Sequence, residues 1–273
     1  MREALAALAA LLASLPAAAD EYPLWEFGLG VGVFAFPDYR GSDQGRGYVL
    51  PIPYAVYRGD FLKADRKGVR GELLESDRVD LHISLGASLP VDSSRNRARA
   101  GMPDLKPSVE IGPSLHLTLW RNAAGDELEI RLPVRAAISI EARPEWLGIV
   151  TTPNLNLDLV GRGVLSGWRF GFLAGPTFGS RPQHEYFYSV APQFATPERP
   201  AYEARGGYGG LQFITAASRR FGGLWVGAFL RADSLRGAAF EDSPLMRRTS
   251  YVAGGAGIAW ILDQSTERVE APE

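Results

Sequence analysis

The segment from Glu127 to Glu141 constrains this chain most, because its side chains fall on two faces with a period of two. That alternation predicts a β-strand and excludes a helix. At about 3.3 Å per residue the strand would be about 50 Å long, giving about 35 Å of rise at the tilt of a membrane barrel strand. One face is aliphatic and the other mostly charged, which predicts lipid on one side and a wet lumen on the other. The aliphatic face comprises Leu128, Ile130, Leu132, Val134, Ala136, Ile138 and Ile140.

Other segments repeat the pattern, at residues 25–36, 79–89, 109–119, 154–161, 168–178, 210–218, 224–233 and 250–262. In the first of these, Gly28, Gly30 and Gly32 share the inward face, where they leave room for bulky lumen side chains.

The weakest region lies between residues 48 and 74. A strand at 48–57 contains Pro51 and Pro53, which cannot donate to a ladder, so we expect it to be irregular or locally unpaired. Short strands are expected at 61–66 and 69–74. The predicted total is twelve strands, with ten as the alternative.

Composition narrows the function classes. The chain has no cysteine, which excludes disulfides, thiolate nucleophiles and Cys-ligated metals. A formal net charge of −2 gives no electrostatic footprint for nucleic acid. A mean hydropathy of −0.08 is far below that of a helical membrane protein but suits a β-barrel, in which half of each strand faces water.

The N-terminus predicts export. A basic start, an apolar run from Ala4 to Leu15 and the small residues Ala17–Ala19 are typical of a signal peptide. We therefore expect residues 1–19 to be a signal peptide, residues 20–262 the barrel and residues 263–273 a polar periplasmic tail.

Connection lengths alternate along the chain. Long connections are expected at 37–47, 90–106, 142–153, 180–209 and 234–248, with short turns between them. Outer-membrane barrels of Gram-negative bacteria have long external loops and short periplasmic turns. The fold class predicted is therefore all-β, a closed antiparallel transmembrane barrel of the cell outer membrane with both termini periplasmic.

The tryptophans give an independent check on this topology. All except Trp146 fall at strand ends on the periplasmic side, as an interfacial aromatic girdle requires. Strict alternation nevertheless points Trp120 and Trp225 inward.

Several motifs resemble those of the MltA-interacting protein and OmpV family of outer-membrane barrels. They are Pro37–Ser42 with Pro51–Pro53 and Tyr57–Gly59, Leu89–Asp92 continuing through Arg99–Leu105 to Glu110–Pro113, Leu132–Arg135, Tyr188–Val190, Arg199–Tyr202, Gly206–Tyr208 and Ser243–Leu245. The resemblance implies a non-catalytic envelope scaffold linking a murein hydrolase with a murein synthase, in contact with outer-membrane lipid and lipopolysaccharide. Many barrels of this membrane end on an aromatic residue of the last strand. This chain differs from them, because eleven residues follow Leu262.

A search for catalytic chemistry gives no site, and we expect no enzyme, cofactor or metal. His82 and His116 take the inward register, where hydrogen-bonded packing is the expected role rather than catalysis. His184 lies in the longest loop and lacks further ligands for a metal. Tyr186, Phe187 and Tyr188 suit loop packing better than contact with a glycan or lipid headgroup.

The inward charges leave two alternatives open. Opposed acidic and basic rows can form a narrow channel for small solutes or ions, or they can pair across the interior and plug it. The plug is the favoured expectation. These residues are Asp80, Glu110, Glu127, Glu129, Arg131, Arg135, Glu141, Arg169, Arg231 and Asp233.

Overall fold

A computed structural model describes residues 21–58, 62–65, 68–71 and 78–270. The predicted signal peptide lies outside the described residues. Within them the chain is all-β, with one α-helix, α2 (Arg181–Tyr188), and three short 3-10 helices, η1 (Ser93–Arg95), η2 (Gly163–Leu165) and η3 (Pro192–Phe194). No helix of the described chain is long and apolar enough to cross a bilayer.

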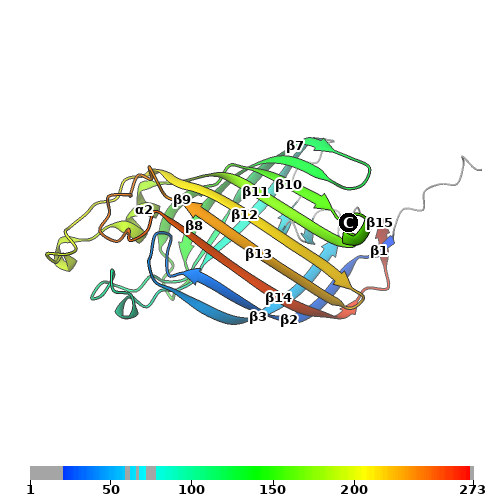
Figure 1. The fold of residues 1–273 in the computed structure, drawn as a ribbon, viewed down its shortest axis with the longest axis horizontal. Coiled ribbons are helices and arrows are strands. Elements are labelled where there is room, and N and C mark those ends of the chain that lie inside the picture. Colours follow the sequence, from blue (N-terminus) through cyan, green and yellow to red (C-terminus); the bar gives the residue numbers. More distant parts are fainter. Residues whose placement is uncertain (1–20, 59–61, 66–67, 72–77, 271–273) are drawn as a thin grey trace, which may run out of the picture.

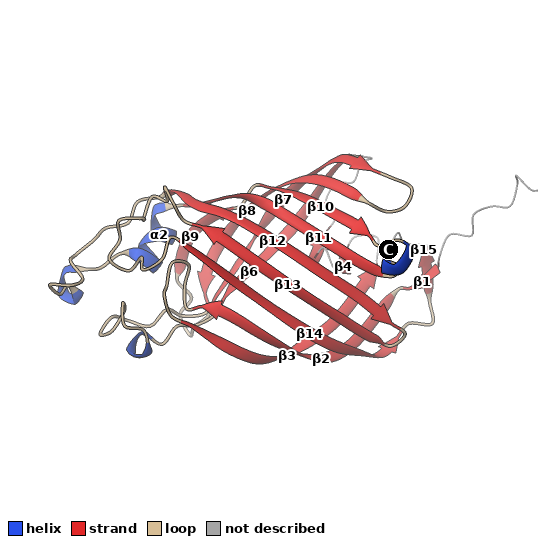
Figure 2. Ribbon diagram, viewed as in Figure 1, coloured by secondary structure: helices blue, strands red, loops and turns tan. Residues whose placement is uncertain are grey.

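One large antiparallel sheet dominates the molecule (Figures 1 and 2). Among the described residues its strands are β2 (Trp25–Pro37), β3 (Gly45–Arg58), β4 (Leu62–Asp65), β5 (Gly68–Gly71), β6 (Val79–Ser88), β7 (Ser108–Arg121), β8 (Glu127–Ser139), β9 (Trp146–Thr151), β10 (Asn154–Val160), β11 (Trp168–Gly179), β12 (Gly207–Phe221), β13 (Leu224–Ser234) and β14 (Ser250–Gln264).

The pairing order is β5-β4-β3-β2-β14-β13-β12-β11-β10-β8-β7-β6. All strands but β9 therefore follow one path, and the first long strand, β2, pairs with the last, β14, over most of its length. The end strands of the path, β5 and β6, lie close to one another. The sheet is strongly curved, and some strands pass behind others in Figure 1.

Strand β9 corrects one prediction. The segment 142–153 was expected to be a loop, but Trp146–Thr151 pairs with both β8 and β11. β10 pairs with the same two neighbours farther along. β9 and β10 thus occupy the same place in the sheet, between β8 and β11, as one strand interrupted at Pro153. Proline has no N–H and cannot donate a hydrogen bond to a neighbouring strand there.

Strand β3 is more regular than expected. It pairs with β2 without a break through Pro51 and Pro53. On its other side the described pairing is limited to Tyr57 and Arg58, which face β4. Arg58 donates its N–H toward Leu24, so the N–H positions of the prolines point to the opposite, β4 side. Proline is tolerated there because no described partner requires a donor.

Burial follows the alternation that the sequence predicts, with the polarity of a water-soluble protein reversed. Along β2, for example, Phe27, Leu29, Val31 and Val33 are exposed, whereas Glu26 is buried on the inner face. Trp120 departs from strict alternation because a register shift between Thr118 and Trp120 turns it to the exposed outer face. Trp225 does point inward, with its ring against Gly227 and 6.3 Å from the Tyr54 ring.

The two ends of the sheet differ. The long connections and α2 gather at one end, called the loop end here (Figure 2). At the other end, β1 (Glu21–Pro23) pairs with β15 (Arg268–Glu270) in a two-stranded sheet. β14 extends to Gln264, so the segment predicted as a polar tail contributes to two strands within the described residues.

Candidate functional site

The inner face of the sheet carries most of the residues that the sequence singled out. His82 on β6 and His116 on β7 are neighbours there, with ring centroids 4.3 Å apart. His116 Nε2 lies 3.0 Å from Ser114 Oγ, and His116 Nδ1 lies 3.8 Å from Glu129 Oε2. A serine, a histidine and a carboxylate in this order are the parts of a catalytic triad, in which the histidine is the base that activates the serine. All four side chains are buried, however, so a substrate does not reach the hydroxyl, and the group is a packed polar cluster.

Two arginines of β8 form ion pairs on the inner face. Arg131 joins the histidine cluster to β10, because it donates from Nε to Glu129 Oε2 at 2.7 Å and from Nη2 to Asp158 Oδ2 at 3.3 Å. Arg135 forms a second group, donating to Glu110 Oε2 at 3.0 Å and to Ser84 Oγ at 3.1 Å. These two charge-paired groups together involve four strands, as the plug alternative expects.

A third arginine group lies where the inner face meets the loop end. Arg231 Nε donates to Asp233 Oδ2 at 2.5 Å, and Arg40 Nη2, from the loop after β2, donates to Asp233 Oδ1 at 2.8 Å. The buried carboxylate thus joins a strand to a loop. At the opposite end, Glu26 accepts from Arg58 at 3.2 Å and from Arg220 at 2.8 Å.

The remaining predicted charges are more peripheral. Glu127 pairs with Arg121 beside a turn. Glu141 lies beyond the end of β8 and accepts from Ser139 Oγ at 2.8 Å. Asp80 and Arg169 take inward register positions, opposite His116 and Ser218. In the described chain no group of three or more metal-ligating side chains is arranged to hold an ion.

Aromatic rings line another part of the inner face. Phe34 stacks with Phe36 at 5.9 Å, and Phe229 lies within 6.4 Å of Phe34. A Cβ on Gly32 would stand 2.5 Å from Ile52 Cδ1 and 2.7 Å from Phe34 Cζ. Glycine at this position therefore makes room for bulky inward side chains, as the sequence predicts. The inner face is polar along β6, β7, β8 and β10, whereas β2 and β13 contribute aromatic rings between charged groups at their ends.

The connections at the loop end form a compact structure, called the cap here, around their own apolar core. The core comprises Tyr39, Val91, Leu105, Tyr188, Val190, Ala204, Leu235, Ala238, Phe240 and Leu245. Tyr188 and Phe240 stack face to face with centroids 3.7 Å apart. Four long connections of the chain contribute to this core, so they support one another instead of extending separately into solvent.

Hydrogen bonds to backbone oxygens hold the cap together. Tyr39 Oη donates to Leu245 O at 2.7 Å. Arg99 donates to Phe187 O at 3.1 Å, and Arg199 donates to Ala98 O at 3.0 Å and Ala100 O at 2.9 Å. The two guanidinium groups therefore connect loops far apart in sequence. Burial raises the pKa of Tyr39 to about 12, which keeps its hydroxyl a donor.

His184, which the sequence places in the longest loop, is a packed residue within that connection. It lies on α2, buried, with its ring centroid 4.7 Å from that of Phe240. Its Nδ1 stands 2.6 Å from Arg205 O, so this nitrogen carries the proton. Burial lowers the pKa of His184 below its ordinary value. Tyr186 supports the packing role expected of it, since its hydroxyl accepts the Lys106 N–H at 2.6 Å.

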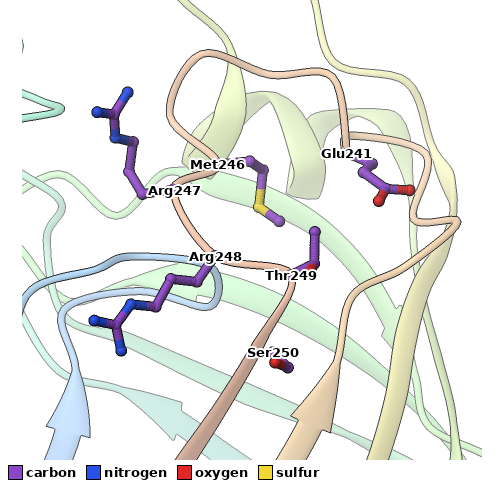
Figure 3. A pocket seen from close by; sticks show the side chains of 6 residues that line it. All are labelled: Glu241, Met246, Arg247, Arg248, Thr249 and Ser250. Atoms are coloured by element: carbon purple, nitrogen blue, oxygen red, sulfur yellow. The ribbon is translucent and has the colours of Figure 1, made fainter.

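A hollow of about 500 Å³ opens on the cap and is lined by Glu241, Met246, Arg247, Arg248, Thr249 and Ser250. Arg247 and Arg248 extend away from Met246 (Figure 3). Their backbone N–H groups both donate to Gly41 O, at 2.8 and 3.0 Å. Glu241 accepts from the Gly237 N–H at 2.6 Å. The hollow therefore reflects how two loops join, and its lining shows no catalytic grouping.

Three comparisons with known proteins complete the description. A family model described as MltA-interacting protein MipA matches residues 29–262. A search of the curated proteins gives no match. A solved structure described as a bacterial polysaccharide outer membrane secretin is similar at 9% identity and a TM-score of 0.40, covering 89% of this chain and all of that one. That structural likeness is too weak to define the fold.

Proposed function

The chain belongs to the MipA family, and from this premise we propose that it is an outer-membrane β-barrel acting as a non-catalytic envelope scaffold. The family is described as MltA-interacting, so the proposed partner is the murein hydrolase MltA. A murein synthase is the second partner that a scaffold of this kind would join to it. In this proposal residues 1–19 are a signal peptide, removed on export, and residues 20–262 build the barrel.

The observation that carries the proposal is the reversed polarity of the sheet. Large aliphatic side chains such as Val33, Val49, Leu230 and Val252 are exposed on the outer face, while Glu26, Glu129 and Asp233 are buried on the inner face. Exposed apolar surface of this extent on a soluble monomer would promote aggregation. Hydrocarbon around the outer face removes that penalty, and closure of the sheet satisfies its edges.

Two features support a scaffold over an open pore. The cap covers the loop end with a packed apolar core. Below the cap, the inward arginines of β8 are paired with the carboxylates of Glu129, Asp158 and Glu110. Paired charges and a packed cap favour a plugged interior, so function would reside in contacts at the ends of the barrel.

The alternative function is a narrow channel for small solutes or ions. It is favoured by the partial exposure of inner-face charges, since the side chains of Arg231 and Asp158 are 29% and 36% exposed. Water therefore reaches these groups from the interior side.

Planar bilayers and binding together test the proposal. We expect the purified full chain to produce no stable single-channel steps and to retain soluble MltA on a sensor surface. Arg135→Ala, which removes the bonds to Glu110 and Ser84, is the control that should raise conductance if the paired charges are the barrier. Stable steps from the wild type without retention of MltA would favour the channel and contradict the scaffold.

A further inference from the structure

One turn at the end opposite the cap exposes apolar side chains to an unusual degree. The turn between β10 and β11 contains η2, whose Val164 is 97% exposed and Leu165 48% exposed. Among the large apolar side chains of the described residues, Val164 has the highest exposed fraction. A single exposed apolar residue is ordinary, but two adjacent ones at the tip of a turn form a small knob.

The turn is held firmly in place. Gly161 donates its N–H to Trp168 O at 2.8 Å, and Ser166 donates to Gly163 O at 3.0 Å. Asp126 from the neighbouring turn accepts the Val160 N–H at 2.8 Å and pairs with Arg162. These contacts fix both bases of the turn, so the Val164–Leu165 tip is presented in one orientation at little entropic cost.

Arg219, Trp168 and Phe221 form a group, called the belt here, that marks how far the tip projects. The Arg219 guanidinium lies over the Trp168 ring at 6.0 Å and over the Phe221 ring at 4.6 Å. Arginine stacked on such rings is typical of the boundary between bilayer and water. Trp168 begins β11, so Val164 and Leu165 lie in the turn beyond this belt. In the proposed topology that places them in the periplasm.

Neighbouring turns lack this feature. The turn at 122–126 reads Asn-Ala-Ala-Gly-Asp, and the turn after β12 is Gly222-Gly223. Among these three turns, the exposed apolar tip is therefore particular to the one between β10 and β11. Arg162 in the same turn and Arg121 beside the neighbouring turn are cations with side chains 59% and 56% exposed, each paired with one carboxylate.

We propose that the Val164–Leu165 tip is the docking contact for a soluble periplasmic protein with an apolar cleft and an acidic rim. The inference rests on the proposed scaffold function and names the surface that function uses. The tip enters the cleft of the partner as a central apolar anchor, and the two arginines meet the rim. Such anchors carry most of the binding energy at interfaces, because water is excluded around them.

The test uses the full chain in nanodiscs and purified soluble MltA in a binding assay. Val164→Asp should weaken binding by roughly tenfold or more, as loss of an interface anchor does. Ala123→Asp is the matched control, because it adds the same charge to an exposed position on the neighbouring turn. We expect its affinity to stay near that of the wild type. If Val164→Asp does not fold, Val164→Ala should still lower affinity, by a smaller factor.

The outcomes separate the two proposals. If the wild type does not bind MltA, the scaffold function fails and the docking contact fails with it. If the wild type and Val164→Asp bind equally, only the docking contact is overturned. Equal weakening by Val164→Asp and Ala123→Asp would also overturn it, since added charge would then be the cause. A photo-reactive residue at 164 that cross-links to lipid and not to MltA would assign the tip to the bilayer.

Discussion

The sheet and the cap of this molecule bury opposite kinds of side chain. On the sheet, Leu230 is exposed and Asp233, three residues later, is buried. In the cap, Phe240 is 1% exposed and packs against other apolar side chains, as in a soluble domain. Between residues 230 and 240 the chain thus passes from an apolar side chain exposed on the sheet to an apolar side chain buried in the cap. In the proposed membrane setting, hydrocarbon around the sheet and water around the cap decide which face of each is apolar.

The largest expected effect tests whether the cap can lose its structure while the sheet keeps its own. Phe240→Ala removes the ring stacked on Tyr188 and should destabilise the cap by about 3–5 kcal/mol, because a large cavity is left in its core. We expect limited proteolysis to cut the loop-end connections of the variant while the strands stay protected. Loss of protection throughout the sheet would show that the two regions are not separate.

The next effect probes the outer face of the sheet. Leu230→Arg, near the middle of β13, should cost about 2–4 kcal/mol of unfolding free energy in lipid vesicles, as a charge at the bilayer midplane does. Phe221→Arg is the control in the belt, where the cost falls to about 0–1 kcal/mol. Equal, small effects at both positions would mean that water, not hydrocarbon, covers this face.

A smaller effect tests one bond in the cap. Tyr39→Phe removes the hydrogen bond to Leu245 O and should lower cap stability by about 1 kcal/mol, a typical net value for one such bond. Hydrogen exchange of the cap amides would measure it. Exchange at wild-type rates would show that the bond contributes nothing to the cap.

The smallest effect is a pH dependence. Because burial lowers the pKa of His184, the folded cap favours the neutral ring. Its contribution is fully present above the ordinary histidine pKa of about 6.5 and is lost as the pH falls through the lowered value. Cap amides of the wild type should therefore show smaller protection factors at pH 5 than at pH 7, once the intrinsic pH dependence of exchange is divided out. His184→Gln should reduce that difference, and an unchanged difference would exclude His184 as its source.

Much of the sheet could be predicted from the sequence, because an alternating pattern reports directly which face of a strand is apolar. Glu127–Ser139 shows this most clearly. The alternation of side chains does not report changes of local geometry, such as the register shift that turns Trp120 outward. It also missed β9, since a short strand ending before Pro153 reads like a loop.

The inner face was predicted in composition but not in pairing. The charged residues were recognised, yet which carboxylate meets Arg135 depends on strand register, which alternation alone does not define. The cap could be predicted only in the loop packing of Tyr186, Phe187 and Tyr188. Its core draws single residues such as Tyr39, Val91 and Phe240 from separate loops, so no periodic signal marks them.

The junction of β2 with β14 has a consequence for biogenesis. Residues near 30 must wait for residues near 258 before their hydrogen-bonding partners exist. Nearly all of the polypeptide is therefore synthesised before this pairing can form. Until then the edge of β2 that meets β14 is open to association with other strands, so we expect shielding of the unfolded chain to matter for this topology.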